Sequence, residues 1–231
     1  MNIPLSRRLQ VCAGFVAPGD RVADIGCDHG YLSIYLLKNG IASHVYASDI
    51  NEGPLQSALH NAHKFGVADK LQLFLSDGVR NIPHDFDTLV CAGMGGDTMV
   101  HILQSAPWLR SKQYRLILQC QSKTPLLRRY LTEQGWRITE ESAVKDGRFI
   151  YTVMEVYWEP EYPKLSIGEW YFPPALLENP GADTVGYFKY VVEGLRIATA
   201  HKEDAEKQQA LQELLALADN PALSFLKEAL Q

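Results

Sequence analysis

Short runs of Val, Ile and Leu alternate with helix-length amphipathic segments along the first 135 residues. This alternation predicts an α/β fold with a parallel sheet covered by helices on both faces. The apolar runs predict strands at residues 21–25, 44–49, 71–75, 86–92 and 114–119. The segments around them, with apolar residues at helical spacing, predict helices at residues 5–16, 30–39, 52–65, 95–106 and 122–134.

The pattern changes after the last of these helices. Residues 136–143 and 148–158 read as two consecutive strands joined by residues 144–147, where Asp146-Gly147 is a hairpin signal. A parallel five-stranded core closed by an antiparallel pair is typical of class I Rossmann-like methyltransferases, with seven strands in a mostly parallel sheet. A dinucleotide-binding fold would instead continue its alternation of strands and helices.

Five prolines between residues 159 and 181 forbid long regular structure and indicate a linker. Beyond it, apolar spacing predicts one long helix or a helical hairpin bending near residues 201–204, with Asn220-Pro221 breaking the helix before a last short one. We therefore expect a catalytic domain at 1–158, a linker at 159–182 and a coiled-coil-like helical appendage at 183–231. The appendage either packs against the main domain or binds a partner or RNA.

The chain has 231 residues, of which 46% are hydrophobic and 21% charged. This composition is that of a globular protein with a real core. No apolar run approaches 18 residues and the N-terminus has no signal-peptide core, so we expect a cytoplasmic protein without a membrane span. The four cysteines form no C-x-x-C pair, which favours reduced thiols and no metal site.

The net charge of −5 hides an asymmetry. Residues 1–150 contain 16 basic and 14 acidic residues, whereas residues 151–231 contain 6 and 13. Nine basic residues against four acidic ones fall within residues 110–148. This segment forms either a phosphate-facing patch or an ordinary solvated helix surface.

Acidic residues end three successive predicted strands. Asp24 and Gly26 open a G-x-x-x-G loop, a spacing that suits a cofactor without phosphates, whose methionine ammonium an acidic residue can face. Asp49 can accept both ribose hydroxyls, and Asp77 with Gly78 can receive the adenine. A single strand-end Asp is more often a helix cap, but three in this order favour a cofactor site.

The fourth predicted strand leads into Ala92-Gly93-Met94-Gly95-Gly96-Asp97. A glycine-rich turn of this kind lets a flat base or a reactive methyl group approach the backbone, with Met94 as a soft apolar wall. The plainer interpretation is a tight turn capped by Asp97.

Several motifs together carry a resemblance over essentially the full chain. They are Leu5-Ser6-Arg7-Arg8-Leu9, Ala23-Asp24-Ile25-Gly26 followed by Asp28-His29, Asn51-Glu52-Gly53-Pro54, Ala92-Gly93-Met94-Gly95-Gly96 and Leu116-Ile117-Leu118-Gln119. In these the sequence resembles the bacterial tRNA adenine N1-methyltransferases that modify adenosine 22. It departs from them at Cys120-Gln121-Ser122, where Pro-Asn is typical, at Gly30 and Ser33, where Ala and Pro are common, and at Asp49, where Glu is common.

The resemblance implies S-adenosylmethionine as cofactor and tRNA as substrate. The sequence leaves the oligomeric state open, and a monomer is favoured. The resemblance places Asp28 beside the cationic product base, and His29 or Gln119 as groups that orient the base. The implied cofactor residues are Asp24, Gly26, Asp49, Ile50, Asp77, Gly78, Ala92, Gly93 and Met94. The implied substrate residues are Arg8, Gly95, Gly96, Lys123, Arg128 and Arg129, the four cations as phosphate contacts. Because N1 lies on the Watson–Crick edge, the base must be extruded, with Tyr31, Met94 and Trp108 as candidate stacking partners.

Two alternatives stay open at this stage. The protein could methylate another RNA base or a small molecule, or it could be a non-catalytic RNA-binding protein that keeps the fold. An NAD-linked oxidoreductase is disfavoured by the glycine spacing and by the terminal hairpin.

Overall fold

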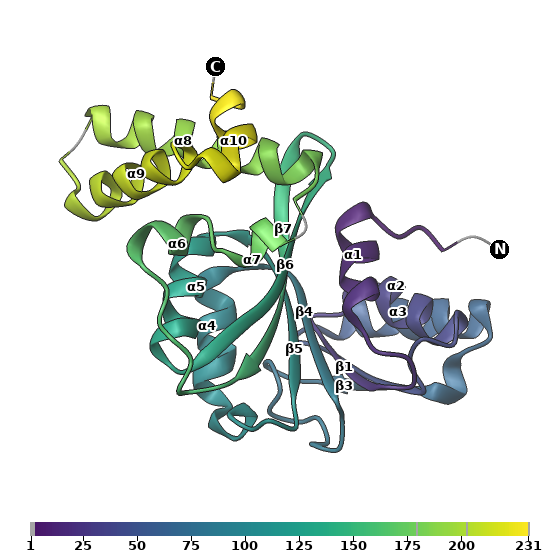
Figure 1. The fold of residues 1–231 in the computed structure, drawn as a ribbon. Helices are drawn as coiled ribbons and strands as arrows, with labels where there is room; N and C mark the ends of the chain where they lie inside the picture. The colour runs from purple at the N-terminus through teal and green to yellow at the C-terminus, as the bar shows by residue number, and fades with distance from the viewer. Residues whose placement is uncertain (1–2, 179, 202, 231) are drawn as a thin grey trace.

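The computed structural model describes residues 3–178, 180–201 and 203–230 and contains a seven-stranded sheet of order β3-β2-β1-β4-β5-β7-β6 (Figure 1). The strands are β1 (Arg21–Ile25), β2 (His44–Asp49), β3 (Leu71–Leu75), β4 (Thr88–Gly95), β5 (Arg115–Ser122), β6 (Trp136–Asp146) and β7 (Phe149–Trp158). Strands β1 to β5 pair in parallel, and β7 pairs antiparallel with both β5 and β6. The predicted fold class is confirmed.

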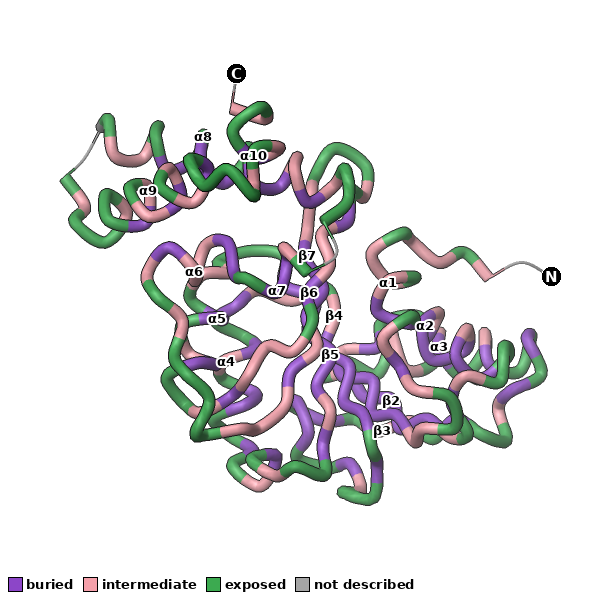
Figure 2. Tube along the Cα trace, in the orientation of Figure 1, coloured by how far each residue is buried: buried purple, intermediate pink, exposed green. Residues whose placement is uncertain are grey.

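Helices cover both faces of the sheet (Figure 1). They are α1 (Arg7–Phe15), α2 (Tyr31–Lys38), α3 (Glu52–Phe65), α4 (Gly96–Ser105) and α5 (Thr124–Glu133). Helices α1 to α3 bury apolar side chains on one face, and α4 and α5 on the other, so two apolar layers flank the sheet. Figure 2 marks the buried residues along the chain trace. Within the described part of the chain, no helix combines the length and apolarity that a membrane crossing requires.

The β6–β7 hairpin is longer than predicted. Asp146 pairs with Phe149, so the loop consists of Gly147 and Arg148 alone rather than residues 144–147. Gly147 has a φ of +63°, as glycine commonly does at the first position of a two-residue hairpin loop. The longer strands carry the hairpin beyond the sheet toward the C-terminal helices (Figure 1).

The C-terminal region forms a helical hairpin with its own core. The predicted linker contains two short helices, α6 (Ile167–Tyr171) and α7 (Ala175–Glu178), and the appendage contains α8 (Ala182–His201), α9 (Ala205–Ala218) and α10 (Ser224–Glu228). The predicted bend falls between α8 and α9, although Lys202 in it lies outside the described residues. Ala143 and Ile150 of the β6–β7 hairpin pack against this core, which joins it to the sheet.

A buried arginine ties the C-terminal region to the sheet. Arg128 of α5 is fully buried and forms an ion pair with Glu141 of β6 at 2.6 Å. Its guanidinium also donates to the carbonyl oxygens of Trp170 and Tyr171 and to the Tyr187 hydroxyl. The prediction that Arg128 contacts phosphates is therefore wrong, because no solvent-facing atom remains to reach RNA.

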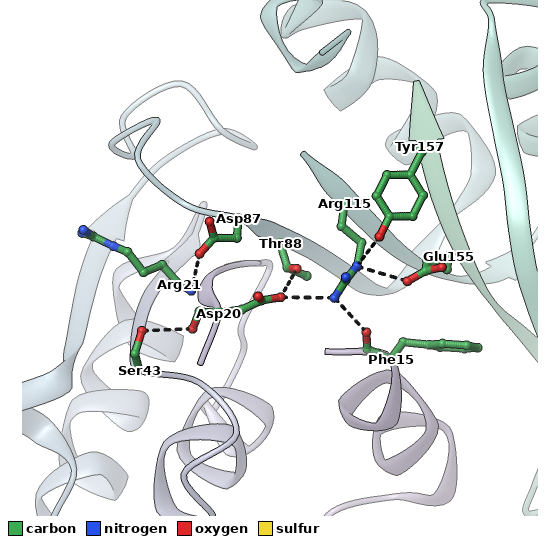
Figure 3. A network of polar contacts seen from close by, with 9 residues as sticks. All are labelled: Phe15, Asp20, Arg21, Ser43, Asp87, Thr88, Arg115, Glu155 and Tyr157. Carbon is green, nitrogen blue, oxygen red and sulfur yellow. Dashed lines mark hydrogen bonds and ion pairs between the residues drawn. The ribbon is translucent and has the colours of Figure 1, made fainter. Parts of the chain in front are cut away.

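A second polar network joins the sheet to α1 at the amino ends of the parallel strands (Figure 3). The Arg115 guanidinium contacts Asp20, Glu155 and the Tyr157 hydroxyl, with distances of 3.3, 3.1 and 2.6 Å. It also donates to the carbonyl oxygen of Phe15, the last residue of α1. This network holds together the start of β5, the end of β7 and the segment before β1. It lies at the edge of the sheet opposite to the carboxyl ends of the parallel strands.

Candidate functional site

A cavity of about 550 Å³ opens at the carboxyl ends of β1, β2 and β4. This is the edge at which open α/β sheets bind ligands. Twelve residues predicted from sequence line it: Arg8, Asp24, Gly26, Asp28, His29, Asp49, Ile50, Asp77, Gly78, Ala92, Gly93 and Met94. Tyr31, a predicted stacking partner, lines it as well.

Asp24 is a buried carboxylate beside the cavity. It is 3% exposed and accepts a hydrogen bond from the Ser33 hydroxyl at 2.6 Å. Burial raises the pKa of Asp24 to about 6, with the Ser33 hydrogen bonds opposing the shift and the Asp49 carboxylate adding to it. The proline common at position 33 in the resembling family could not donate this bond. Among the residues that the structure describes, none forms an ion pair with Asp24, so this buried carboxylate is suited to receive a ligand's positive charge.

Asp28 and His29 are exposed at the rim of the cavity, and Asp49 beside them is half-buried. Asp28 adopts a left-handed φ of +50°, and its backbone N–H points to the Asp49 carboxylate at 3.4 Å. The His29 Nε2 atom lies 3.6 Å from Asp28 Oδ1, with both side chains more than half exposed. A left-handed non-glycine residue is uncommon and often marks a functional turn. Asp28 is therefore held at the mouth of the cavity, with its side chain exposed.

Gly93 forms a β-bulge in β4. Ala92 pairs with Gln119 and Met94 with Cys120, so Gly93 is the extra residue, with a φ of +84°. The Gly93 N–H donates to the Gln119 side-chain oxygen at 3.1 Å instead of to the ladder. Bulges bend a strand locally and occur next to active sites. Here the bulge turns the backbone of Gly93 toward the cavity.

The buried Gln119 side chain on the neighbouring strand β5 stabilises this bulge by accepting a hydrogen bond from the Gly93 N–H. Its oxygen also accepts from the Arg8 guanidinium at 2.8 Å, and its nitrogen donates to the Cys120 carbonyl at 3.1 Å. Gln119 is fully buried and does not line the cavity. The prediction that Gln119 orients the base is wrong, because its amide is occupied by Gly93, Arg8 and Cys120. It acts instead as a positioning residue.

Close packing brings the first and fourth strand ends together. Gly26 has a φ of +72°, and a Cβ atom at this position would overlap the Met94 methyl group. The positive φ favours glycine at residue 26, whereas the flexible Met94 side chain could move away from a Cβ atom. The two predicted loops thus form one wall of the cavity.

Five of the other predicted contacts lie away from the cavity. Gly96 is buried against the Lys123 carbonyl, so its predicted substrate contact is wrong, and Gly95 packs beside Ser122. Trp108 stacks on His84 with ring centroids 3.7 Å apart, ahead of β5 and at the opposite edge, so it cannot stack on a bound base. Lys123 and Arg129 remain partly exposed, each in an ion pair: Lys123 with Asp97, and Arg129 with Glu133 and Glu206.

Nine other lining residues were not among the predicted contacts. Five of them directly neighbour predicted ones in the sequence: Ile25, Cys27, Leu32, Asn51 and Ser76. The remaining four were missed altogether: Leu9 comes from α1, and Thr98, His101 and Ile102 come from one face of α4. The i, i+3, i+4 spacing of the α4 residues, directly after the glycine-rich segment, was the available signal. It shows which face of that helix borders the cavity.

The charge of the cavity restricts its ligand. Four carboxylates line it, from Asp24, Asp28, Asp49 and Asp77, against a single arginine, Arg8. Arg8 is itself paired with Asp146 at 3.6 Å. A pyrophosphate would be repelled by this set, whereas a cationic ligand carrying a ribose matches both the buried charge and the acceptor pair of Asp49. The residues therefore fit the cationic cofactor that the sequence predicts.

Comparison with known proteins places this geometry in a family. Residues 5–154 match the family described as methyltransferase domain, a span that contains the cavity and the whole parallel sheet. The chain belongs to this methyltransferase domain family. The match covers the region from α1 to β7 and ends before the C-terminal helices.

Several relatives within the family are similar over more of the chain. The tRNA (adenine(22)-N(1))-methyltransferase of Bacillus subtilis is 32% identical over 154 residues, which are 66% of this chain and 65% of that protein. The crystal structure of the B. subtilis m1A22 tRNA methyltransferase TrmK has a TM-score of 0.77 at 26% identity and covers both chains fully. A Streptococcus pneumoniae protein in complex with S-adenosyl-L-methionine has a TM-score of 0.79 at 28% identity, covering 98% of this chain and 100% of its own. The likeness in structure thus includes the C-terminal helices of this methyltransferase.

Proposed function

We propose that this protein transfers the methyl group of S-adenosylmethionine to N1 of an adenine in tRNA, at adenosine 22. The observation that carries the proposal is the acidic cavity built on the Asp24 loop and the Gly93 bulge. The likeness to the B. subtilis tRNA (adenine(22)-N(1))-methyltransferase supports the choice of substrate. A tRNA substrate implies a cytoplasmic enzyme. We assign catalysis to residues 1–158, with 159–182 as a linker and 183–231 as the helical appendage.

The cofactor residues divide by chemistry. Asp24 carries the negative charge for the ammonium group, Asp49 accepts from the ribose hydroxyls, and Asp77 with Gly78 receives the adenine. Ile50 is 66% exposed at the rim, where it can cover the adenine face. When bound, S-adenosylmethionine supplies an electrophilic methyl group.

The acceptor base enters on the side of Arg8 and Gly93. The Arg8 guanidinium lies against Gly93, held by Gln119 and Asp146. Gly93 and Tyr31 both line the cavity, and the Tyr31 ring can stack on the base. In this arrangement the main work of the protein is alignment, because the lone pair of adenine N1 is free in the neutral base.

Asp28 stabilises the product. Methylation forms the N1–carbon bond as the carbon–sulfur bond breaks, and the adenine becomes a cation. The Asp28 carboxylate, held at the mouth of the cavity by a left-handed turn, stabilises that positive charge as it develops. His29, 3.6 Å from Asp28, is placed to donate a hydrogen bond to the base.

The test is methylation of a tRNA transcript with labelled cofactor, followed by nucleoside analysis. We expect label in 1-methyladenosine and its loss when adenosine 22 is replaced by guanosine. Label in another nucleoside would refute the proposed acceptor atom. No binding of S-adenosylhomocysteine by calorimetry would refute the enzyme itself and favour a non-catalytic RNA-binding protein.

A further inference from the structure

A second cavity, of about 860 Å³, lies where the turn after β5, the tip of the β6–β7 hairpin and α8 meet. We call it the hairpin groove; its walls include Gln121, Lys123, Phe149, Tyr151 and Tyr190. The site described above does not use these side chains. The groove nevertheless adjoins that site, because Gln121 packs against Gly93, which lines the first cavity.

Exposed apolar side chains gather in the hairpin groove. Of the eight most exposed large apolar residues among those the structure describes, three line it: Phe149 at 50%, Tyr190 at 65% and Ile197 at 64%. Phe149 and Tyr151 lie with ring centroids 6.0 Å apart at a 45° tilt. Single exposed apolar residues are common on protein surfaces, whereas a cluster of them indicates a binding site. Aromatic rings in such a cluster favour a planar partner, on which they can stack.

The groove contains one cation that can contact a phosphate. Arg148, Lys123 and Lys207 line it together with Glu193, but Lys123 is paired with Asp97 and Lys207 with Asp204. Across the described part of the chain, no carboxylate lies within ion-pair distance of Arg148. Its guanidinium instead sits 4.8 Å from the centroid of the Phe149 ring. Cations interleaved with aromatic rings are the usual surface for single-stranded nucleic acid.

The backbone of the groove is also unusual. Lys123 has a φ of +57°, and among the described non-glycine residues only Asp28 shares a left-handed conformation. Asp28 lines the first cavity and Lys123 the second. Left-handed non-glycine residues persist where the surrounding structure enforces them, often at binding sites. The Lys123 carbonyl lies so close to Gly96 that a Cβ atom there would approach it to 2.6 Å.

We propose that the hairpin groove binds the unpaired nucleotides next to the methylated adenosine. A flanking base stacks on Phe149 or Tyr190, and Arg148 contacts the adjoining phosphate. This inference rests on the proposed function, since it takes tRNA as the substrate. It assigns the C-terminal helices a direct contact with RNA through α8, despite their acidic composition.

The test measures binding of an unmodified tRNA transcript by Phe149→Ala, Tyr190→Ala and Arg148→Ala at several salt concentrations. Loss of a stacking ring should weaken binding at least fivefold without changing the salt dependence. Arg148→Ala should weaken binding and lower the slope of log K against log salt by about one unit. Tyr162→Ala is the matched control, because Tyr162 is 44% exposed but lies outside the groove.

Calorimetry with S-adenosylhomocysteine shows whether each variant keeps its fold and first cavity. Wild-type tRNA affinity in all three groove variants would overturn the inference, even with tRNA methylation by the wild type intact. Unchanged tRNA binding together with an altered oligomeric state would also overturn it, because the groove would then be a contact between copies of the chain. Failure of the wild type to methylate any tRNA would instead overturn the proposed function.

Discussion

Asp24→Asn separates the stability of the empty protein from its affinity for cofactor. Burial raises the pKa of Asp24 to about 6 from an ordinary value of 3.8. The native state therefore binds this proton more tightly than the unfolded chain does. The contribution of Asp24 to stability is greatest below pH 3.8 and is lost as the pH rises through about 6. Above that, the buried charge costs on the order of 3 kcal/mol.

Asparagine keeps an oxygen that can accept from Ser33, and it carries no charge. Its stability relative to wild type should therefore grow with pH, by about 1.5 kcal/mol between pH 5 and pH 8. For a chain of this length that difference corresponds to roughly 3–6 °C in Tm. Circular dichroism melts of both proteins without cofactor, at pH 5 and pH 8, measure it. Equal differences in Tm at the two pH values would refute the assignment of a raised pKa to Asp24.

Binding should follow the opposite trend. The ionised Asp24 carboxylate is the form that attracts an ammonium group, so wild-type affinity for S-adenosylhomocysteine should rise about tenfold from pH 5 to pH 7 and then level off. In Asp24→Asn the affinity should be weaker and independent of pH over this range. Calorimetry gives both curves. A wild-type curve as flat as that of the variant would contradict the pairing of Asp24 with a cationic ligand.

Three further substitutions test the residues that support the site. Gln119→Leu leaves the Gly93 N–H without its acceptor, so the free energy of unfolding in urea should fall by about 1–3 kcal/mol and transfer of labelled methyl should slow. Gln119→Glu should be intermediate, and full activity in the leucine variant would contradict the role of the bulge. Arg128→Met leaves the buried Glu141 carboxylate without its ion-pair partner and should lower the free energy of unfolding by about 3–5 kcal/mol. The double variant with Glu141→Leu should recover most of this loss, and equal losses in the single and double variants would show that packing rather than charge matters. Asp28→Asn should lower kcat roughly fivefold, a modest effect because the carboxylate is exposed, and should leave the S-adenosylhomocysteine affinity unchanged; a change confined to that affinity would move Asp28 to the cofactor.

The carboxylates that line the cavity could be predicted because they lie at or just after the ends of strands. Parallel strands bring their carboxyl ends to one edge, so Asp24, Asp49 and Asp77 had to meet once the alternation of strands and helices was recognised. No contact between distant segments had to be known in advance.

The supports of the site could not be predicted in this way. Arg128 lies in an amphipathic helix where arginine normally faces water, and its partners Glu141 and Tyr187 are 13 and 59 residues further along the chain. Gln119 reads as a strand-end polar residue facing the ligand, but the bulge at Gly93 turns that ladder position into a buried hydrogen bond. Both errors come from long-range pairing, which leaves no local pattern.

The sheet order affects how the protein can be made on the ribosome. Strand β7 lies between β5 and β6, so until β7, which ends at residue 158, has been synthesised, β5 is the edge of the sheet and β6 has no strand in the sheet to pair with. Arg128 waits longer, because Tyr187 emerges 59 residues later, about 3–12 s at ordinary rates of translation. During that interval the Arg128 guanidinium, which is fully buried in the folded protein, is still hydrated. The catalytic half therefore cannot reach its final form as a nascent chain until the C-terminal helices begin to appear.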